Sequence, residues 1–567
     1  MKAQYIIGVH DGHNAAAALV KDGFLEFAIQ EERLAGTKNY YGFPTRSIQA
    51  CLAHSGLRPD DIEELAFASM RRAPARFQVR SQRTSIEREQ TLVGTARRLA
   101  LWYPVYRIAH NLGWSERRAT AVKLGFRAEQ CQRYPHHLGH AATAYFGMRK
   151  DPNSPHLVIT LDGKGDLESG TVSIGERGQL RRIAATPFTD SLGAIYALTT
   201  GAMGFVPLEH EYKLMGMAPY ASSQYAAAAT EAFRQLIEVD RDGLRLRRRT
   251  VEPTFAVLRR LHAMLRGMRF DNACAGLQNL CEEIVVDLVG AAIRKTGIRN
   301  VVCAGGVFMN VKANKRLREL PEVDYLGIAP SCGDESMSFG IAWYAQARRT
   351  GDGTAIPPLD GNIYVGTDVA DQDAARVVEA SGYSYHRHGD IEAEVAKILS
   401  SGHPVARCKG RMEFGARALG NRSILADPRN PDVVRVINQM IKKRDFWMPF
   451  APVVRYERLR DYFEASEGFE SPYMMHTFDT GDRVGEFMGA VHNADLTART
   501  QTVRREHNPD YYRILSCFEE ETGRGVLLNT SFNLHGEPIV LGPEQAMHVF
   551  RKSGLEYLAL GQYLVAK

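Results

Sequence analysis

Two histidines one helical turn apart could bind a single metal ion. His136 and His140 lie in the stretch PHHLGHAATAYF, and side chains at positions i and i+4 of a helix share one face, roughly 6 Å apart. Asp162 ends an apolar, strand-like run, and Asp334 lies in the turn PSCGDE. Two imidazoles and two carboxylates form a mixed shell that suits Fe(II), Mn(II) or Zn(II). For each aspartate taken singly, capping its turn is the simpler interpretation.

Three glycine-bearing turns in the first half of the chain predict a nucleotide site. They are residues 11–14 (DGHN), 162–166 (DGKGD, with Gly163 and Gly165) and the pair Gly305-Gly306, which is followed by Asn310. Glycine lets the backbone approach a ligand closely, and a helix N-terminus offers unpaired N–H groups to phosphate. One diglycine turn is a weak signal, but three at strand ends in one lobe are the arrangement that cradles a nucleotide.

A basic, glycine-rich segment in the second half is typical of a phosphate-binding loop. Residues 409–422 (KGRMEFGARALGNR) contain four Lys or Arg and three Gly, after a strand expected at 405–408. Arginine presents forked donors that match phosphate oxygens. Farther on, residues 527–533 (LLNTSFN) place neutral amide and hydroxyl donors after an apolar strand, where they suit an amide-like group such as carbamoyl. A solvated basic face is the alternative for the first segment.

The elements that must position these residues follow an α/β pattern. The sequence predicts strands at 5–9, 15–20, 24–30, 64–69, 157–161 and 300–304, and helices at 46–55, 59–64, 136–149 and 275–296. Repetition of strand, glycine turn and helix predicts a lobe with two similar halves. Charge, Gly and Pro interrupt the pattern at 348–359, so we expect one domain at 1–350 and another at 360–567.

Composition restricts the class of protein. With 44% hydrophobic and 24% charged residues, the 567-residue chain is typical of a globular protein, and we expect it in the cytoplasm, away from membranes. The eight cysteines have no metal-ribbon or disulfide spacing. Residues 71–130 hold thirteen Lys or Arg against four Glu, a basic insertion that could meet an anionic substrate or a nucleic acid. Without an aromatic stacking pattern, a solvated helical insertion is the simpler interpretation.

Several motifs together resemble the carbamoyltransferase family that includes the nodulation and antibiotic-tailoring O-carbamoyltransferases (the NodU/CmcH type). They are HNAAAALVKDG, EERLAGTKNYYGFP, HHLGHAA, LDGKGD, EYKLMGMAPY, AGGVFMN, PSCGDE, KGRMEFGARALGNRSILADPR, TARTQTV and LLNTSFNLHGEPIV. The resemblance implies an N-terminal actin-like ATPase lobe similar to Kae1 and a C-terminal α/β lobe similar to YrdC. It also implies transfer of carbamoyl from carbamoyl phosphate, through ATP (with Mg²⁺) and carbamoyl-adenylate, to a hydroxyl of a small acceptor such as a natural product or sugar-like molecule.

The resemblance also assigns roles to residues of this chain. The metal residues, with Fe(II) as the expected ion, are His136, His140, Asp162 and Asp334. The acceptor-activating residues are Asp11, His13 and Lys38. The nucleotide residues are Gly163, Gly165, Gly305, Gly306 and Asn310. The carbamoyl-phosphate residues are Arg417, Lys442, Arg499, Asn529 and Ser531.

Two positions depart from the family pattern. Met448 stands where an Arg usually precedes Pro-Phe-Ala-Pro, so one phosphate contact is missing or is supplied by Lys443 or Arg444. Asn14 stands where Asp is common. A tRNA-modifying enzyme with the same two lobes and a catalytically silent metal- and nucleotide-binding regulator are the alternatives. The sequence does not favour nucleic acid as a partner, and it leaves a homodimer and the acceptor open.

Overall fold

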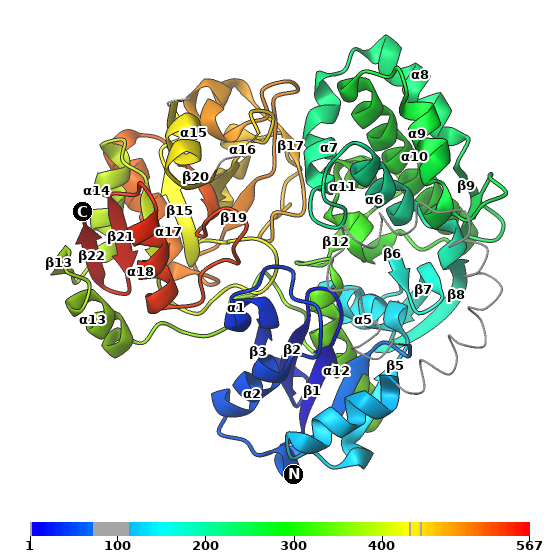
Figure 1. Ribbon diagram of the computed structural model, residues 1–567, viewed down its shortest axis with the longest axis horizontal. Coiled ribbons are helices and arrows are strands. Elements are labelled where there is room, and N and C mark those ends of the chain that lie inside the picture. The colour runs from blue at the N-terminus through cyan, green and yellow to red at the C-terminus, as the bar shows by residue number, and fades with distance from the viewer. Residues whose placement is uncertain (1–2, 72–112, 430–431, 443–444) are drawn as a thin grey trace. The chain divides into compact units, whose positions relative to one another are not determined.

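The computed structural model describes residues 3–71, 113–429, 432–442 and 445–567, which form two compact units (Figure 1). The first unit comprises Met1–Glu31 and Tyr40–Pro358, and the second comprises Glu32–Asn39 and Leu359–Lys567. Arg33 fixes the short N-terminal segment of the second unit, because its guanidinium donates a hydrogen bond to the Gly415 carbonyl (2.8 Å). Most of the expected basic insertion, residues 72–112, lies outside the described residues.

The first unit contains two five-stranded sheets with the same strand order. The first sheet runs β3 (Phe24–Gln30), β2 (Ala16–Lys21), β1 (Tyr5–His10), β4 (Ile62–Ala68) and β5 (Cys131–Tyr134). The second runs β8 (Gln179–Pro187), β7 (Glu168–Glu176), β6 (His156–Gly165), β11 (Asn300–Ala304) and β12 (Tyr325–Ile328). In both sheets the first three strands pair antiparallel and the last two add in parallel. The predicted two similar halves are therefore confirmed, as a duplicated α/β lobe.

Two helices pack together between these sheets. Helix α5 (His136–Met148) contacts β6 and β11, and helix α12 (Met337–Thr350) contacts β1 and β2 as well as α5. A Cβ added at Gly340 would lie 2.5 Å from the Gly139 carbonyl oxygen, so the glycine allows the two helices to approach closely. Residues at the start of both helices are thereby brought next to the end of β6.

Most elements lie where the sequence pattern predicts them. The strands expected at 24–30 and 300–304 match β3 and β11 residue for residue. The helix expected at 275–296 begins earlier, as α10 (Phe270–Thr296). The helix expected at 59–64 is wrong, because only Pro59–Asp61 forms a 3-10 turn before β4 begins at Ile62. All eight cysteines are buried.

The second unit is built around an eight-stranded mixed sheet. Its order is β13 (Ser384–Arg387), β22 (Tyr563–Ala566), β21 (Tyr557–Leu560), β14 (Val405–Cys408), β15 (Arg422–Ala426), β20 (Val526–Ser531), β16 (Ala451–Arg455) and β19 (Gln501–Val503). Ile424 packs with α13 (Asp371–Glu379) and α18 (Pro543–Lys552). Its neighbour Leu425 packs with α14 (Ile391–Ser400) and α17 (Pro509–Thr522). Because successive side chains of a strand point to opposite faces, both faces of this sheet are covered.

No helix in the described part of the chain combines the length and the apolar composition needed to span a bilayer.

Gly165, at the end of β6, makes room for the first residue of α5. A Cβ at Gly165 would lie 1.9 Å from Cδ2 of His136, whereas a Cβ at Gly163 would meet no atom within 4 Å. We therefore expect Gly165→Ala to displace the His136 ring and to lower the free energy of unfolding by about 1–3 kcal/mol, as overpacking does. Denaturant titration measures the change. Gly163→Ala is the matched control and should stay within about 0.5 kcal/mol of wild type; equal losses in both variants would contradict the packing assigned to Gly165.

Candidate functional site

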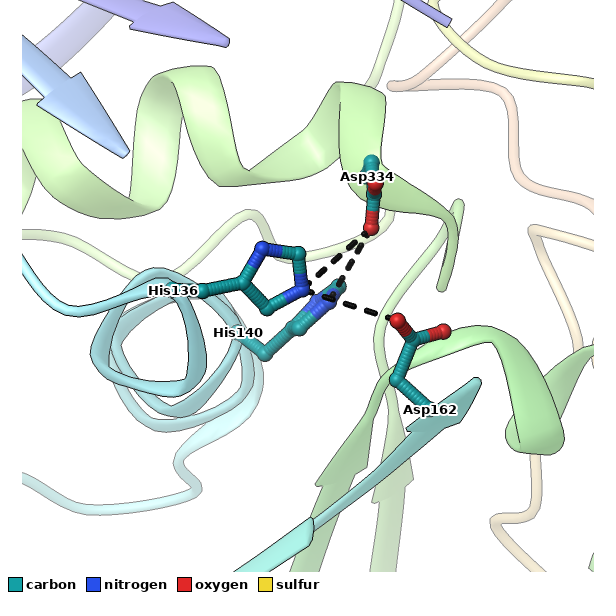
Figure 2. A group of neighbouring side chains, drawn as sticks. All are labelled: His136, His140, Asp162 and Asp334. Carbon is teal, nitrogen blue, oxygen red and sulfur yellow. Dashed lines mark ion pairs between the residues drawn. The ribbon is translucent and has the colours of Figure 1, made fainter. Parts of the chain in front are cut away.

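Four predicted metal residues converge between the two halves of the first unit (Figure 2). His136 and His140 point from one face of α5, Asp162 lies on β6 and Asp334 lies directly before α12. His136 Nε2 is 3.5 Å from Asp162 Oδ2 and 3.5 Å from Asp334 Oδ1, and His140 Nε2 is 3.4 Å from the same Asp334 oxygen. One donor atom of each residue lies within 4.8 Å of all the others.

The donor set fits a divalent cation. The Nε2 atoms of both histidines are buried and, among the described residues, make no hydrogen bond. Ligand atoms around a tetrahedral ion with bonds of about 2.1 Å are separated by roughly 3.4 Å, which is close to the imidazole–carboxylate separations seen here. Both imidazoles meet the carboxylates only at ion-pair distances, and a cation between these atoms would give each Nε2 a bonded partner. Two nitrogens and two carboxylates suit Fe(II), Mn(II) or Zn(II), and the arrangement does not choose among them.

The electrostatics of this group are those of tightly paired charges. Burial alone would lower the pKa of His136, but Asp334, Asp162 and the nearby Asp166 outweigh it and raise that pKa to about 9. Burial opposes ionisation of Asp162 as well, and the two histidines nevertheless lower its pKa to about 2. His137, on another face of α5, has its pKa lowered to about 3 by burial and by its histidine neighbours. His137 is therefore neutral, and its Nδ1 shares a hydrogen bond with Thr160 Oγ1 (2.9 Å).

Neighbouring backbone groups orient the metal residues. The Gly306 amide donates to Asp162 Oδ1 (3.0 Å), which leaves Oδ2 of Asp162 toward His136. The His136 amide donates to Asp166 Oδ2 (2.8 Å), and the same carboxylate accepts from the amides of Met70 (3.1 Å) and Arg71 (2.8 Å). Asp166 thus holds the start of α5 and the chain after β4 together. Such surrounding contacts fix the direction of metal ligands.

The glycines predicted to contact a nucleotide have local packing roles. Gly305 has φ of 102°, and a Cβ there would lie 2.2 Å from the Leu161 carbonyl oxygen. Asn310 caps α11 (Val311–Arg318) by accepting from the Ala313 amide (3.1 Å), and its side-chain amide group donates to Gln278 Oε1 (2.9 Å). These contacts explain the residue types without a ligand, and the nucleotide role stays a prediction.

The predicted acceptor-activating residues are placed differently from one another. Asp11 is buried, and both of its oxygens accept from Arg117, from Nε at 2.6 Å and from Nη2 at 2.8 Å. His13 lies two positions after Asp11, and its carbonyl oxygen is 3.1 Å from His10 Nε2. The same His10 nitrogen lies 3.4 Å from Asp334 Oδ2. Lys38 is exposed in the Glu32–Asn39 segment of the second unit. Arg117 thus holds Asp11 in a buried ion pair, and the acceptor-activating roles stay predictions.

Asn14 adopts φ of 57°, in the left-handed region. Asn and Asp are the non-glycine residues that enter this region most readily, so the departure from Asp leaves the turn intact.

In the second unit, two of the predicted carbamoyl-phosphate residues touch directly. Lys442 ends a π-helical turn, Asn438–Lys442, and is buried. Its Nζ donates to Ser531 Oγ (3.1 Å) and to Asn533 Oδ1 (2.8 Å). A short π-helical turn is often found at functional sites. Met448 lies farther along the chain, and the substitutes considered for it, Lys443 and Arg444, lie outside the described residues.

Asn529 contacts the segments that carry the other two predicted residues, Arg417 and Arg499. Its side-chain amide group donates to the Ala418 carbonyl, next to Arg417, and to Gln501 Oε1, two residues after Arg499 (both 3.1 Å). Asn529 Oδ1 is buried and, in the part of the chain that is described, accepts no hydrogen bond. The segments that carry all five predicted residues are therefore assembled around the end of β20.

Most cations of the predicted phosphate-binding loop have another role. Arg422 is fully buried and donates to five backbone carbonyl oxygens, those of Thr367, Lys409, Gly410, Asn421 and Leu541. Arg411 donates to the Val365 carbonyl (2.9 Å), and Lys409 pairs with Glu392 (2.6 Å). These three cations therefore hold the loop that carries Arg417.

Sequence reasoning missed several residues that the structure places in these groups. Arg117 lies at the end of the expected insertion and carried no signal beyond its charge. Asp166, Gln501 and Asn533 stand inside quoted motifs, DGKGD, TARTQTV and LLNTSFN, and their polar side chains in those motifs could have been singled out. His10 precedes Asp11 directly.

Metal binding should depend on pH through His136. Its raised pKa stabilises the metal-free fold fully below pH 6.5, and this contribution is lost as pH rises through about 9. A metal ion must displace the same proton, so binding should strengthen over that window. We expect the increase in Tm caused by Mn(II), measured by scanning calorimetry after chelator treatment, to be larger at pH 9 than at pH 6.5. An increase of equal size at both values would contradict coordination by His136.

The chain matches known proteins over nearly its whole length. Residues 5–343 match the carbamoyltransferase N-terminus model, and residues 396–567 match the carbamoyltransferase C-terminus model. Nodulation protein NolNO of Sinorhizobium fredii is 32% identical over 98% of this chain and 79% of its own length. Nodulation protein U of Rhizobium tropici is 28% identical over 94% of this chain and 91% of its own.

Likeness to solved structures is weak. Full-length HypF in its phosphate- and nucleotide-bound form covers 60% of this chain and 55% of its own at 14% identity, with a TM-score of 0.32, which supports no conclusion about the site. The family models and the relatives decide the matter: the chain belongs to the carbamoyltransferase family and is a transferase.

Proposed function

We propose that this enzyme transfers a carbamoyl group from carbamoyl phosphate, through carbamoyl-adenylate formed with ATP, to a hydroxyl group of a small acceptor. The observation that carries the proposal is the pairing of two separate groups in one carbamoyltransferase chain. One is the cation-fitting cluster around His136, and the other is the anion-fitting cluster around Lys442.

The first domain, which we place at residues 1–350, would bind ATP (with Mg²⁺) and the divalent metal. His136, His140, Asp162 and Asp334 would hold that metal, which would polarise phosphate or carbonyl oxygens when bound. The turn at Gly305-Gly306 precedes α11, whose N-terminus could face phosphate. These parts support nucleotide chemistry beside a cation.

The second domain, which we place at residues 360–567, would bind carbamoyl phosphate. Lys442 and Arg417 would balance the phosphate charge, and Arg499 would add to it. Asn529 Oδ1 suits the amino group of the carbamoyl moiety, because a buried acceptor lowers its energy by accepting a hydrogen bond.

The proposed chemistry has three balanced steps. Hydrolysis of carbamoyl phosphate gives carbamate and inorganic phosphate. A carbamate oxygen then attacks the α-phosphorus of ATP, and pyrophosphate leaves. The acceptor hydroxyl finally attacks the carbonyl carbon, AMP leaves, and the hydroxyl proton passes to His13. Asp11, neutralised by Arg117, would hold the turn of His13 in place.

Described arginines give little support to a nucleic-acid substrate. In the first unit, Arg234, Arg241 and Arg247 pair with Glu283, Asp287 and Glu238. Positive charge that is already paired contributes less to phosphate binding. We therefore propose a natural product or sugar-like molecule as the acceptor.

We expect a substitution at the metal cluster to affect pyrophosphate formation without affecting phosphate release. With ATP, carbamoyl phosphate and a divalent metal, mass spectrometry should detect carbamoyl-adenylate from the wild-type enzyme. We expect His136→Ala to reduce pyrophosphate formation at least about a hundredfold, because losing even a group that orients a metal ligand typically costs about 10–100-fold in activity. The same variant should release phosphate from carbamoyl phosphate at a rate within about twofold of wild type.

The matched control is His262→Ala, at an exposed histidine of α9 (Leu258–Leu265). It should leave both products unchanged. A His136→Ala enzyme that forms carbamoyl-adenylate at the wild-type rate would refute the role given to this cluster.

A further inference from the structure

Asn529 carries a buried oxygen atom that lacks a hydrogen-bond donor. The residue is 2% exposed, and in the part of the chain that is described its Oδ1 accepts no hydrogen bond. Its Nδ2 donates to the Ala418 carbonyl oxygen and to Gln501 Oε1, both at 3.1 Å. Both amide hydrogens are therefore used, and the oxygen is the atom left for a ligand. A buried acceptor without a donor is costly, and a ligand that donates an N–H group would remove this cost.

Gln501 fixes the orientation of the Asn529 amide. Gln501 lies on β19 and is 1% exposed. Its Nε2 donates to the Leu419 carbonyl oxygen (3.0 Å), so its Oε1 is the atom that faces Asn529. Turning the Asn529 amide over would place its oxygen against two acceptors, Gln501 Oε1 and the Ala418 carbonyl oxygen. The amide therefore keeps its nitrogen toward Gln501.

The Leu419 peptide group is held independently of Asn529. Its amide donates to Glu413 Oε1 (2.6 Å), and its carbonyl oxygen also accepts from the Tyr364 hydroxyl (2.8 Å). Gln501 thus donates to an acceptor whose position two other side chains set. Leu419 orients Gln501, and Gln501 in turn orients Asn529.

The groups of carbamoyl phosphate differ in their hydrogen-bonding capacity. Its phosphate and carbonyl oxygens accept hydrogen bonds, whereas its amino group carries the N–H donors. A buried acceptor at Asn529 Oδ1 can therefore bind the amino group and not the oxygens. Acetyl phosphate has a methyl group in place of the amino group and would leave this acceptor unpaired. Sites built to bind an N–H group reject analogues that lack it.

We propose that Gln501 is a specificity-determining residue, which selects an acyl phosphate with an N–H group over one with a methyl group. It acts as a positioning residue, because it keeps the nitrogen of the Asn529 amide turned toward itself and leaves the oxygen to the ligand. The proposal rests on the function proposed above and adds to it the residue that determines how the amino end of the carbamoyl donor is recognised.

Two phosphonates test this selection without turnover. Phosphonoacetamide and 2-oxopropylphosphonate have the same heavy-atom skeleton, but the first carries an amino group where the second carries a methyl group. Calorimetric titration should show that the wild-type enzyme binds phosphonoacetamide at least about tenfold more tightly. We expect Gln501→Met, which keeps the size of the side chain and removes its polar atoms, to reduce this preference to about threefold or less. Gln501→Ala makes the same test if Gln501→Met does not fold.

A double variant shows whether Gln501 acts through Asn529. Asn529→Ala should reduce the preference to about twofold or less, and adding Gln501→Met should change it by no more than about a further twofold. Gln372→Met is the matched control, since it makes the same change at an exposed position of α13. It should keep the wild-type preference. Circular dichroism checks that each variant is folded.

The outcomes are distinct. If folded Gln501→Met keeps the wild-type preference, or weakens binding of both phosphonates by the same factor, the specificity role is overturned. Equal binding of the two phosphonates by wild type, or binding of neither, would overturn it as well. If wild type releases no phosphate from carbamoyl phosphate, the proposed function fails, and the phosphonate titrations still decide the role of Gln501.

Discussion

The close approach of two partly buried carboxylates to two buried imidazoles is the constraint on which the first unit depends. A buried carboxylate is costly unless it is paired, and a buried imidazole is costly unless its nitrogens are used. Asp162 and Asp334 form ion pairs with His136 and His140, and Asp334 lies 172 positions after Asp162 in the chain. The duplicated sheets, the close approach of α5 and α12 at Gly340 and the space left at Gly165 all place these four side chains together.

In the second unit, buried cationic side chains are stabilised by hydrogen bonds to oxygen atoms. Arg422 and Arg407 are buried, and backbone carbonyls accept from both. Such arginines stabilise a loop whose backbone would otherwise lack partners. Lys442 differs because side-chain oxygens hold it at the end of a π-helical turn. Buried arginines thus support the backbone at two positions, and we propose that Lys442 contributes to anion binding.

Residue types and spacing predicted the metal residues and most of the elements that carry them. The i, i+4 histidines and the aspartates on β6 and before α12 were identifiable, because the elements that carry them follow from periodicity and glycine turns. Contacts between side chains that lie far apart in the chain could not be identified from the sequence. Arg117 meets Asp11 across 106 positions, and nothing in the sequence marks it among thirteen basic residues of its segment. The roles of Arg422 and Arg417 could not be distinguished from the sequence, because the two residues differ in burial and not in type. Nor does the pattern show that Glu32–Asn39 packs with the second unit.

The most direct test of the central claim is X-ray absorption spectroscopy at the metal edge of protein loaded with Fe(II) or Mn(II). The account predicts a shell of nitrogen and oxygen ligands at about 2.0–2.2 Å that includes two imidazoles, with the imidazole contribution reduced by half in His140→Ala. A spectrum without imidazole scattering, or one that the substitution leaves unchanged, would contradict the account.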